Sequence, residues 1–168
     1  MTSENRRSPV AVVMGSDSDL AVMQGCIKQL ESFGISPVVR IISAHRTPDV
    51  AVDFADSAIE SGIKVIIAAA GMAAHLAGTL AARTTLPVIG VPLAAPEGLA
   101  GLDALLSTVQ MPPGVPVASV AIGKAGAKNA AVLAVQILAL SDEELAAKLG
   151  DFRKAQSQRA IERDASLG

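Results

Sequence analysis

The feature that most constrains the fold is a regular alternation of apolar, strand-like runs with helical patterns along the 168-residue chain. Strands buried on both faces read as nearly continuous apolar runs rather than as alternating ones. Such strands, each followed by a helix, predict a parallel sheet covered by helices on both faces. The strand-like runs are 10–14, 38–42, 64–70, 87–91 and 115–122.

Five parallel strands fit a flavodoxin-like, doubly wound, three-layer αβα sheet in one domain. We expect a flexible N-terminal tail over residues 1–8, the flavodoxin-like domain over 9–140 and a projecting C-terminal helix over 141–164. The final 28 residues hold 11 of the 30 charged side chains, which indicates a solvated or projecting helix. Right-handed crossovers bring all strand ends to one edge, where α/β proteins bind ligands.

The connection after the second run contains an imidazole, a guanidinium and two hydroxyls within six residues, 43–48. Thr47 is the predicted N-cap of the next helix and Pro48 its first residue. His45 and Arg46 then lie at the exit of a buried strand, where an anion bound by Arg46 also faces the positive end of the helix. The same residues fit an ordinary capped loop with a surface histidine.

Two other strand exits carry polar side chains. Ser16 and Asp19 match a capping box, and their hydroxyl and carboxylate also suit sugar hydroxyls or a phosphate. His75 is predicted just inside the third helix among Ala and Gly residues, either beside a ligand or as a hydrogen-bonded core histidine. The exits at 92–98 and 123–126 belong to the same edge and complete the candidate site.

Charge and hydropathy exclude several classes of partner. A net charge of -2 provides no basic field for nucleic acid, and no basic amphipathic segment favours a membrane surface. The uncharged stretch 65–82 contains a histidine and two glycines, so it fits a buried strand entering a close-packed helix better than a membrane span. The polar N-terminus lacks the apolar run of a signal peptide, and we expect a cytoplasmic protein with a small-molecule ligand.

Missing motifs exclude the common cofactors. The first strand is not followed by G-x-G-x-x-G, the chain has no G-x-x-x-x-G-K-[ST], and it has no Trp or Tyr to stack on a flavin. Two histidines in separate loops without paired carboxylates make a weak metal site. The single cysteine, Cys26, falls beside an apolar helical stripe and is predicted to pack there. We therefore expect neither a metal nor a cofactor.

The middle of the chain is poor in charge. Between residues 65 and 123 the charged residues are Arg83, Glu97 and Asp103, whereas an average soluble sequence has roughly one charged residue in four. A small domain exposes much of its surface, so this segment predicts burial between copies in a homo-oligomer.

Eight ordered stretches resemble one known family, the class I N5-carboxyaminoimidazole ribonucleotide mutases (the PurE family), from residue 10 to about residue 156. The matching stretches are 14–19, 43–48, 73–76, 87–92, 101–107, 109–112, 114–117 and 121–130. The resemblance implies a cytosolic, octameric isomerase of purine biosynthesis with no metal or nucleotide cofactor. It also implies that the C-terminal helix reaches onto a neighbouring subunit.

The family reaction moves a carboxylate from the exocyclic amine of an aminoimidazole ribonucleotide to C4 of the ring, through trapped carbon dioxide. By resemblance, His45 is the acid and base of both half-reactions. The residues that the resemblance assigns to substrate binding are Ser16, Ser18, Asp19, Ser43 and Arg46 around the ribose phosphate, and Gly71, Ala73 and His75 around the carbon dioxide.

The chain departs from the family pattern at Met72 and Ala77, where many relatives have Gly and Pro. Loss of the glycine matters if position 72 takes a positive φ. Two alternatives stand beside the mutase. One is the related animal-type carboxylase, which uses dissolved carbon dioxide and has a different glycine-rich loop. The other is a phospho-acceptor receiver domain, which needs an aspartate at the end of the third strand, where this chain has Ala70 and Gly71.

Overall fold

A computed structural model describes residues 8–167, and most of the predicted N-terminal tail (1–7) lies outside the described residues. Its centre is a five-stranded, all-parallel sheet with strand order β2-β1-β3-β4-β5. This order is the doubly wound order of flavodoxin-like folds, so the predicted fold class is confirmed. The strands are β1 (Val10–Met14), β2 (Val38–Ile41), β3 (Val65–Gly71), β4 (Val88–Leu93) and β5 (Ala118–Ser119).

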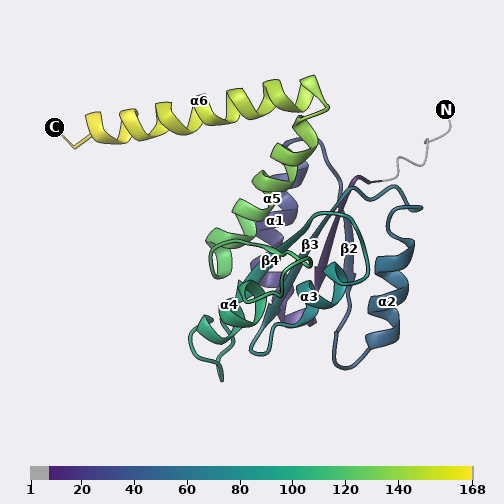
Figure 1. The fold of residues 1–168 in the computed structure, drawn as a ribbon. Coiled ribbons are helices and arrows are strands. Elements are labelled where there is room, and N and C mark those ends of the chain that lie inside the picture. The colour runs from purple at the N-terminus through teal and green to yellow at the C-terminus, as the bar shows by residue number, and fades with distance from the viewer. Residues whose placement is uncertain (1–7, 168) are drawn as a thin grey trace.

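Helices cover both faces of the sheet (Figure 1). Helices α1 and α5 pack together on one face, while α2, α3 and α4 lie on the other. The helical elements are η1 (Asp17–Asp19), α1 (Leu20–Ser32), α2 (Pro48–Ser57), α3 (Leu76–Ala81), α4 (Leu102–Val109), α5 (Gly123–Ala139) and α6 (Glu143–Ala165).

The residues that each strand and helix buries recur at the spacing of its secondary structure. In β1, Val10, Val12 and Met14 face the α1/α5 side, and the two residues between them face the α2/α3 side. In α1, the buried residues are Met23, Cys26, Ile27 and Leu30, which recur at the spacing of one helical face. Cys26 packs in this core as predicted, and burial raises the pKa of its thiol to about 12.

The second strand is not buried, contrary to the prediction. All four residues of β2 are exposed, and Ile41 keeps 55% of its surface. The sheet order explains the error, because β2 pairs with β1 alone and forms the edge of the sheet. Its apolar residues are therefore uncovered within one chain.

The fifth strand is much shorter than predicted. Only Ala118 and Ser119 pair with β4, and one further hydrogen bond joins the amide of Val120 to the carbonyl of Gly90. Pro112, Pro113 and Pro116 precede the strand, and proline donates no hydrogen bond to a β-ladder.

The C-terminal helix α6 extends away from the αβα body (Figure 1). It begins at Asp142, whose carboxylate accepts a 3.0 Å hydrogen bond from the amide of Leu145. Leu145 is buried, and the Phe152 ring meets Phe33 edge-on at 5.3 Å between centroids. Beyond Phe152 every described residue of α6 is exposed. No described helix is long and apolar enough to cross a bilayer.

Candidate functional site

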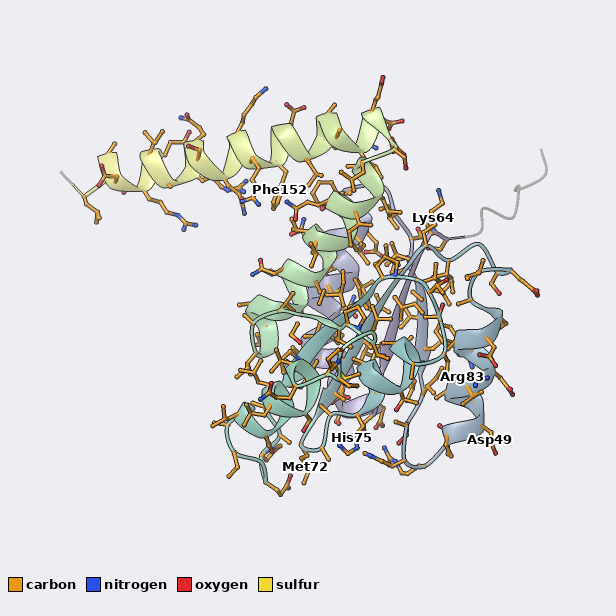
Figure 2. All side chains as sticks on the ribbon, viewed as in Figure 1. Asp49, Lys64, Met72, His75, Arg83 and Phe152 are labelled. Atoms are coloured by element: carbon orange, nitrogen blue, oxygen red, sulfur yellow. The ribbon has the colours of Figure 1, made fainter. Side chains whose placement is uncertain are left out.

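The carboxyl ends of four strands surround a cavity of about 510 Å³. Figure 2 shows His75 and Met72 at this edge, while Lys64, just before β3, lies at the opposite edge of the sheet. All nine residues that the sequence assigned to the site line the cavity: Ser16, Ser18, Asp19, Ser43, His45, Arg46, Gly71, Ala73 and His75. The fifth exit, 123–126, does not line it, because β5 lies at the far edge of the sheet.

The turn after β1 is a capping box. The Ser16 hydroxyl accepts from the Ser18 amide at 3.4 Å, and an Asp19 carboxylate oxygen accepts from the Ser16 amide at 3.1 Å. The predicted cap is thus present, and it begins η1 rather than α1 directly. Burial raises the pKa of the Asp19 carboxyl, although hydrogen bonds from Ser16, Ser18 and Gly15 oppose this shift.

The turn after β2 presents His45 and Arg46. The Ser43 hydroxyl accepts from the backbone amide of Arg46 at 3.1 Å and from its Nε at 3.4 Å. The other end of the guanidinium donates to the carbonyl of Gly15 at 3.1 Å. Arg46 therefore bridges the exits of β1 and β2 and places a fixed positive charge at the cavity wall.

Thr47 and Pro48 occupy the predicted N-cap and first helical positions of α2. Thr47, however, makes no side-chain capping hydrogen bond to the helix. Its hydroxyl is bonded instead to the backbone of Ser43, accepting from the amide and donating to the carbonyl, both at 3.0 Å. Thr47 is therefore the N-cap by position, as predicted, but its hydroxyl points back into the turn and does not cap the helix.

The two histidines of the chain meet in the cavity. His45 Nε2 lies 2.8 Å from His75 Nδ1, with the rings edge-on at 4.9 Å between centroids. His75 occupies the N-cap position of α3, one residue earlier than predicted. A hydrogen bond between two imidazoles needs one donor nitrogen and one acceptor nitrogen, so the pair holds together with no positive charge or with one. Two imidazolium rings would lack an acceptor and would repel each other.

The turn after β3 is narrow and strained. A Cβ added at Gly71 would lie 3.2 Å from the carbonyl oxygen of Leu93, so this position favours glycine. Met72 has φ 53°, in the left-handed region that side chains rarely adopt. Many relatives have glycine at position 72, and because φ is positive here, its replacement by Met72 strains the backbone. Met72 is about half exposed and borders the cavity.

The predicted exit 92–98 contributes to the cavity, although none of its residues was singled out individually from the sequence as a site residue. Ala95, Pro96 and Glu97 border the cavity, and Glu97 adds a carboxylate to it. The signal was present, because 92–98 was recognised as a strand exit and Glu97 as one of three charges in a long uncharged segment. Within residues 8–167, no group of three His, Cys, Asp or Glu side chains is arranged to hold a metal ion.

This arrangement supports proton transfer beside a bound anion. Hydrogen-bond donors for anionic or hydroxyl oxygens come from Arg46, Ser16, Ser18 and Ser43. The histidine pair offers an acid and a base within the same cavity.

Comparison with known proteins identifies the family of the chain. A family model described as AIR carboxylase matches residues 9–159. The N5-carboxyaminoimidazole ribonucleotide mutase of Escherichia coli K12 is 53% identical over 162 residues, covering 96% of this chain and 95% of the relative. The mutase of Brucella melitensis is 56% identical over 154 residues, covering 92% and 94%.

A solved structure shares the fold. The crystal structure of Treponema denticola PurE superimposes with a TM-score of 0.84 at 31% identity, covering 94% of this chain and 97% of that one. The family model spans most of the sequence, and close relatives match it nearly end to end. The chain therefore belongs to the AIR carboxylase family.

Proposed function

We propose that this protein is an isomerase of purine biosynthesis, an N5-carboxyaminoimidazole ribonucleotide mutase that forms 4-carboxy-5-aminoimidazole ribonucleotide. Relatives with that name are 53% and 56% identical over almost the whole chain. The observation that carries the proposal is the convergence of His45, His75 and Arg46 on one cavity. Such a cavity joins an anion anchor to a proton donor and acceptor, which are the two requirements of this reaction.

The substrate phosphate and ribose bind along the exits of β1 and β2. Arg46 supplies charge-assisted hydrogen bonds to phosphate oxygens, and the hydroxyls of Ser16, Ser18 and Ser43 supply further donors. Asp19 accepts from ribose hydroxyls. These side chains line the same cavity, so one nucleotide can contact all of them.

His45 performs both proton transfers. As an imidazolium it gives its proton to the carbamate nitrogen while the N–C bond breaks, which releases carbon dioxide and the free amine. C4 of the ring then attacks the carbon dioxide, and the neutral His45 removes the C4 proton after the C–C bond has formed. The proton balance closes, because His45 ends the cycle protonated as it began.

Carbon dioxide stays in the cavity between the two steps. Gly71 and Ala73 leave room beside His75, and Met72 lies next to them at the rim. Exclusion of water here prevents loss of the intermediate to bicarbonate.

Several copies of the chain assemble, an octamer by family resemblance, in the cytoplasm. The exposed apolar face of α4, formed by Leu102, Leu106 and Val109, supports this assembly, because lone domains rarely leave such a stripe uncovered. In this assembly α6 packs on a neighbouring subunit, since an isolated helix gains little stability in water.

The related carboxylase reaction is the second candidate, favoured by the description of the matching family model. Purified protein is given the N-carboxylated substrate in buffer depleted of carbon dioxide, and separately the unsubstituted aminoimidazole ribonucleotide with bicarbonate. We expect rapid conversion in the first assay. Conversion in the second assay alone would reject the mutase and support the carboxylase.

A further inference from the structure

The turn between β2 and α2 carries the two most important side chains of the proposed site on an exposed segment. Ser43 and Ala44 are partly buried, whereas His45, Arg46 and Thr47 are all exposed, so burial anchors the start of this turn and not the part that carries the two side chains. Ordering each backbone residue costs conformational entropy. Specific hydrogen bonds must therefore fix the exposed part of the turn.

The Thr47 hydroxyl makes two of these bonds. It accepts from the Ser43 amide at 3.0 Å and donates to the Ser43 carbonyl at 3.0 Å. The Thr47 amide donates to the same carbonyl at 2.9 Å. One side chain thus ties both backbone groups of Ser43 to the opposite end of a turn that has His45 at its centre.

The helix does not account for this hydroxyl. At an N-cap, a threonine oxygen ordinarily accepts from an amide in the first helical turn. Thr47 makes no such bond, although it occupies the N-cap position and Pro48 follows it. A contribution to helix stability would require the opposite orientation of the side chain.

The turn that Thr47 closes sets the positions of both functional groups. The Ser43 hydroxyl accepts hydrogen bonds from the Arg46 amide and from Arg46 Nε. The position of the Ser43 backbone therefore affects the position of the guanidinium. His45 must reach 2.8 Å from His75, which stands on a different element. A small opening of the turn would move both side chains away from their partners.

We propose that Thr47 is a positioning residue, whose hydroxyl closes the 43–47 turn and thereby holds His45 against His75 and Arg46 against the β1 exit. This inference rests on the proposed function for its kinetic consequences. Its structural consequence, the geometry of the histidine pair, can be measured without any substrate.

The test compares Thr47→Val, which keeps the shape and removes the hydroxyl, with Thr47→Ser, which keeps the hydroxyl. For Thr47→Val we expect kcat/KM to fall about 10- to 100-fold, with a lower kcat and a higher KM, because misplacement of about 1 Å has effects of this size. We also expect the pH profile of kcat to change. Thr47→Ser should retain most of the wild-type activity.

Nuclear magnetic resonance of the ring nitrogens provides a readout that does not depend on activity. The chain has two histidines, so each ring signal is readily assigned. Thr47→Val should shift the ¹⁵N signals of His45 and His75 in the free protein, and Thr47→Ser should leave them in place. If Thr47→Val does not fold, Thr47→Ala replaces it in both measurements.

Asp142→Ala is the matched control, because it removes a true helix cap far from the cavity. It should lower Tm and leave kcat, KM and the histidine signals unchanged. Unchanged histidine signals in Thr47→Val, or equal loss in Thr47→Val and Thr47→Ser, would overturn the positioning role. If the wild-type protein converts no substrate, the proposed function fails, while the histidine signals still decide the role of Thr47.

Discussion

Two loops each deliver one histidine to the cavity, and they are held by different means. The loop after β2 carries His45 and is closed by the side-chain hydroxyls of Ser43 and Thr47 together with one backbone hydrogen bond, from Thr47 to Ser43. The loop after β3 carries His75 and is closed by backbone hydrogen bonds, from Ala74 to Met72 and from His75 to Ala73. The second loop also includes a residue in the left-handed region, whereas the first contains none.

The two loops should therefore respond differently to substitution, because the first carries exposed reactive side chains and the second has a strained backbone. In the first loop the reactive groups are exposed side chains, so side-chain substitutions should alter binding and proton transfer. In the second loop the conformation depends on which residues tolerate the backbone angles, so glycine and alanine substitutions should alter stability first.

The largest expected effect is on turnover in His45→Asn. Loss of a general acid and base removes about 10²- to 10⁴-fold of rate, and we expect kcat to fall within that range. The amide keeps a polar group facing His75, so substrate affinity should change little. Single-turnover kinetics and equilibrium binding measure the two quantities. A kcat near that of wild type would remove His45 from its proposed role.

Arg46→Lys should act mainly on binding. Lysine keeps the charge but loses the fork of donors that reaches an anion and the Gly15 carbonyl together. We expect KM to rise about tenfold, which corresponds to about 1.4 kcal/mol. Steady-state kinetics at several salt concentrations measure this change. A change confined to kcat would show that the guanidinium does not anchor the substrate.

Met72→Gly should stabilise the protein. A left-handed conformation costs a residue with a side chain about 1–2 kcal/mol, and glycine removes this cost. Glycine also raises the conformational entropy of the unfolded chain, which offsets part of the stabilisation. We expect the free energy of unfolding to rise by up to about 1 kcal/mol, measured by urea denaturation at one protein concentration.

The control is Met72→Ala, which removes the side chain but keeps a Cβ at the same φ. It should leave stability close to that of wild type. Equal stabilisation by alanine and glycine would show that strain at this position is negligible.

The smallest effect concerns Asp19. Burial raises the pKa of the Asp19 carboxyl above its value in the unfolded chain. Between these two pKa values the folded chain therefore binds more protons than the unfolded chain. Stability should therefore decrease as the pH rises through the Asp19 pKa. Asp19→Asn keeps an oxygen acceptor for the Ser16 amide and should lose this part of the slope. Urea denaturation across acidic pH compares the two, and parallel curves would contradict the assignment.

The candidate site was predictable because it depends on the ends of parallel strands. Ser16, Arg46 and His75 stand just after apolar runs, and a parallel sheet brings such ends to one edge whatever the details of packing. The 2.8 Å contact between His45 and His75 was not predictable in the same way. It depends on β1 lying between β2 and β3, so that the two loops face each other across one strand.

The errors have the same origin. The run 38–42 is mostly apolar, like a central strand, and the exposure of residues 38–41 follows from the place of β2 at the edge of the sheet. Thr47 has the residue type and position of a helix cap, but the turn before it offers the Ser43 backbone as a nearer partner. Local pattern indicates which groups a residue can bond to, and the folded turn decides among them.

The amino-acid sequence alone determined the elements and the chemistry of this protein. Apolar runs and helical periodicity define parallel strands and the helices between them, and the residues at the strand ends predict a site for anion binding and proton transfer. The tertiary structure alone decided which strand lies at the edge, that the two histidines touch, and that Met72 is strained. The physical reason is the separation along the sequence of the residues involved. Periodicity depends on residues that are close along the chain, whereas these three features arise from contacts between distant segments that the sheet brings together.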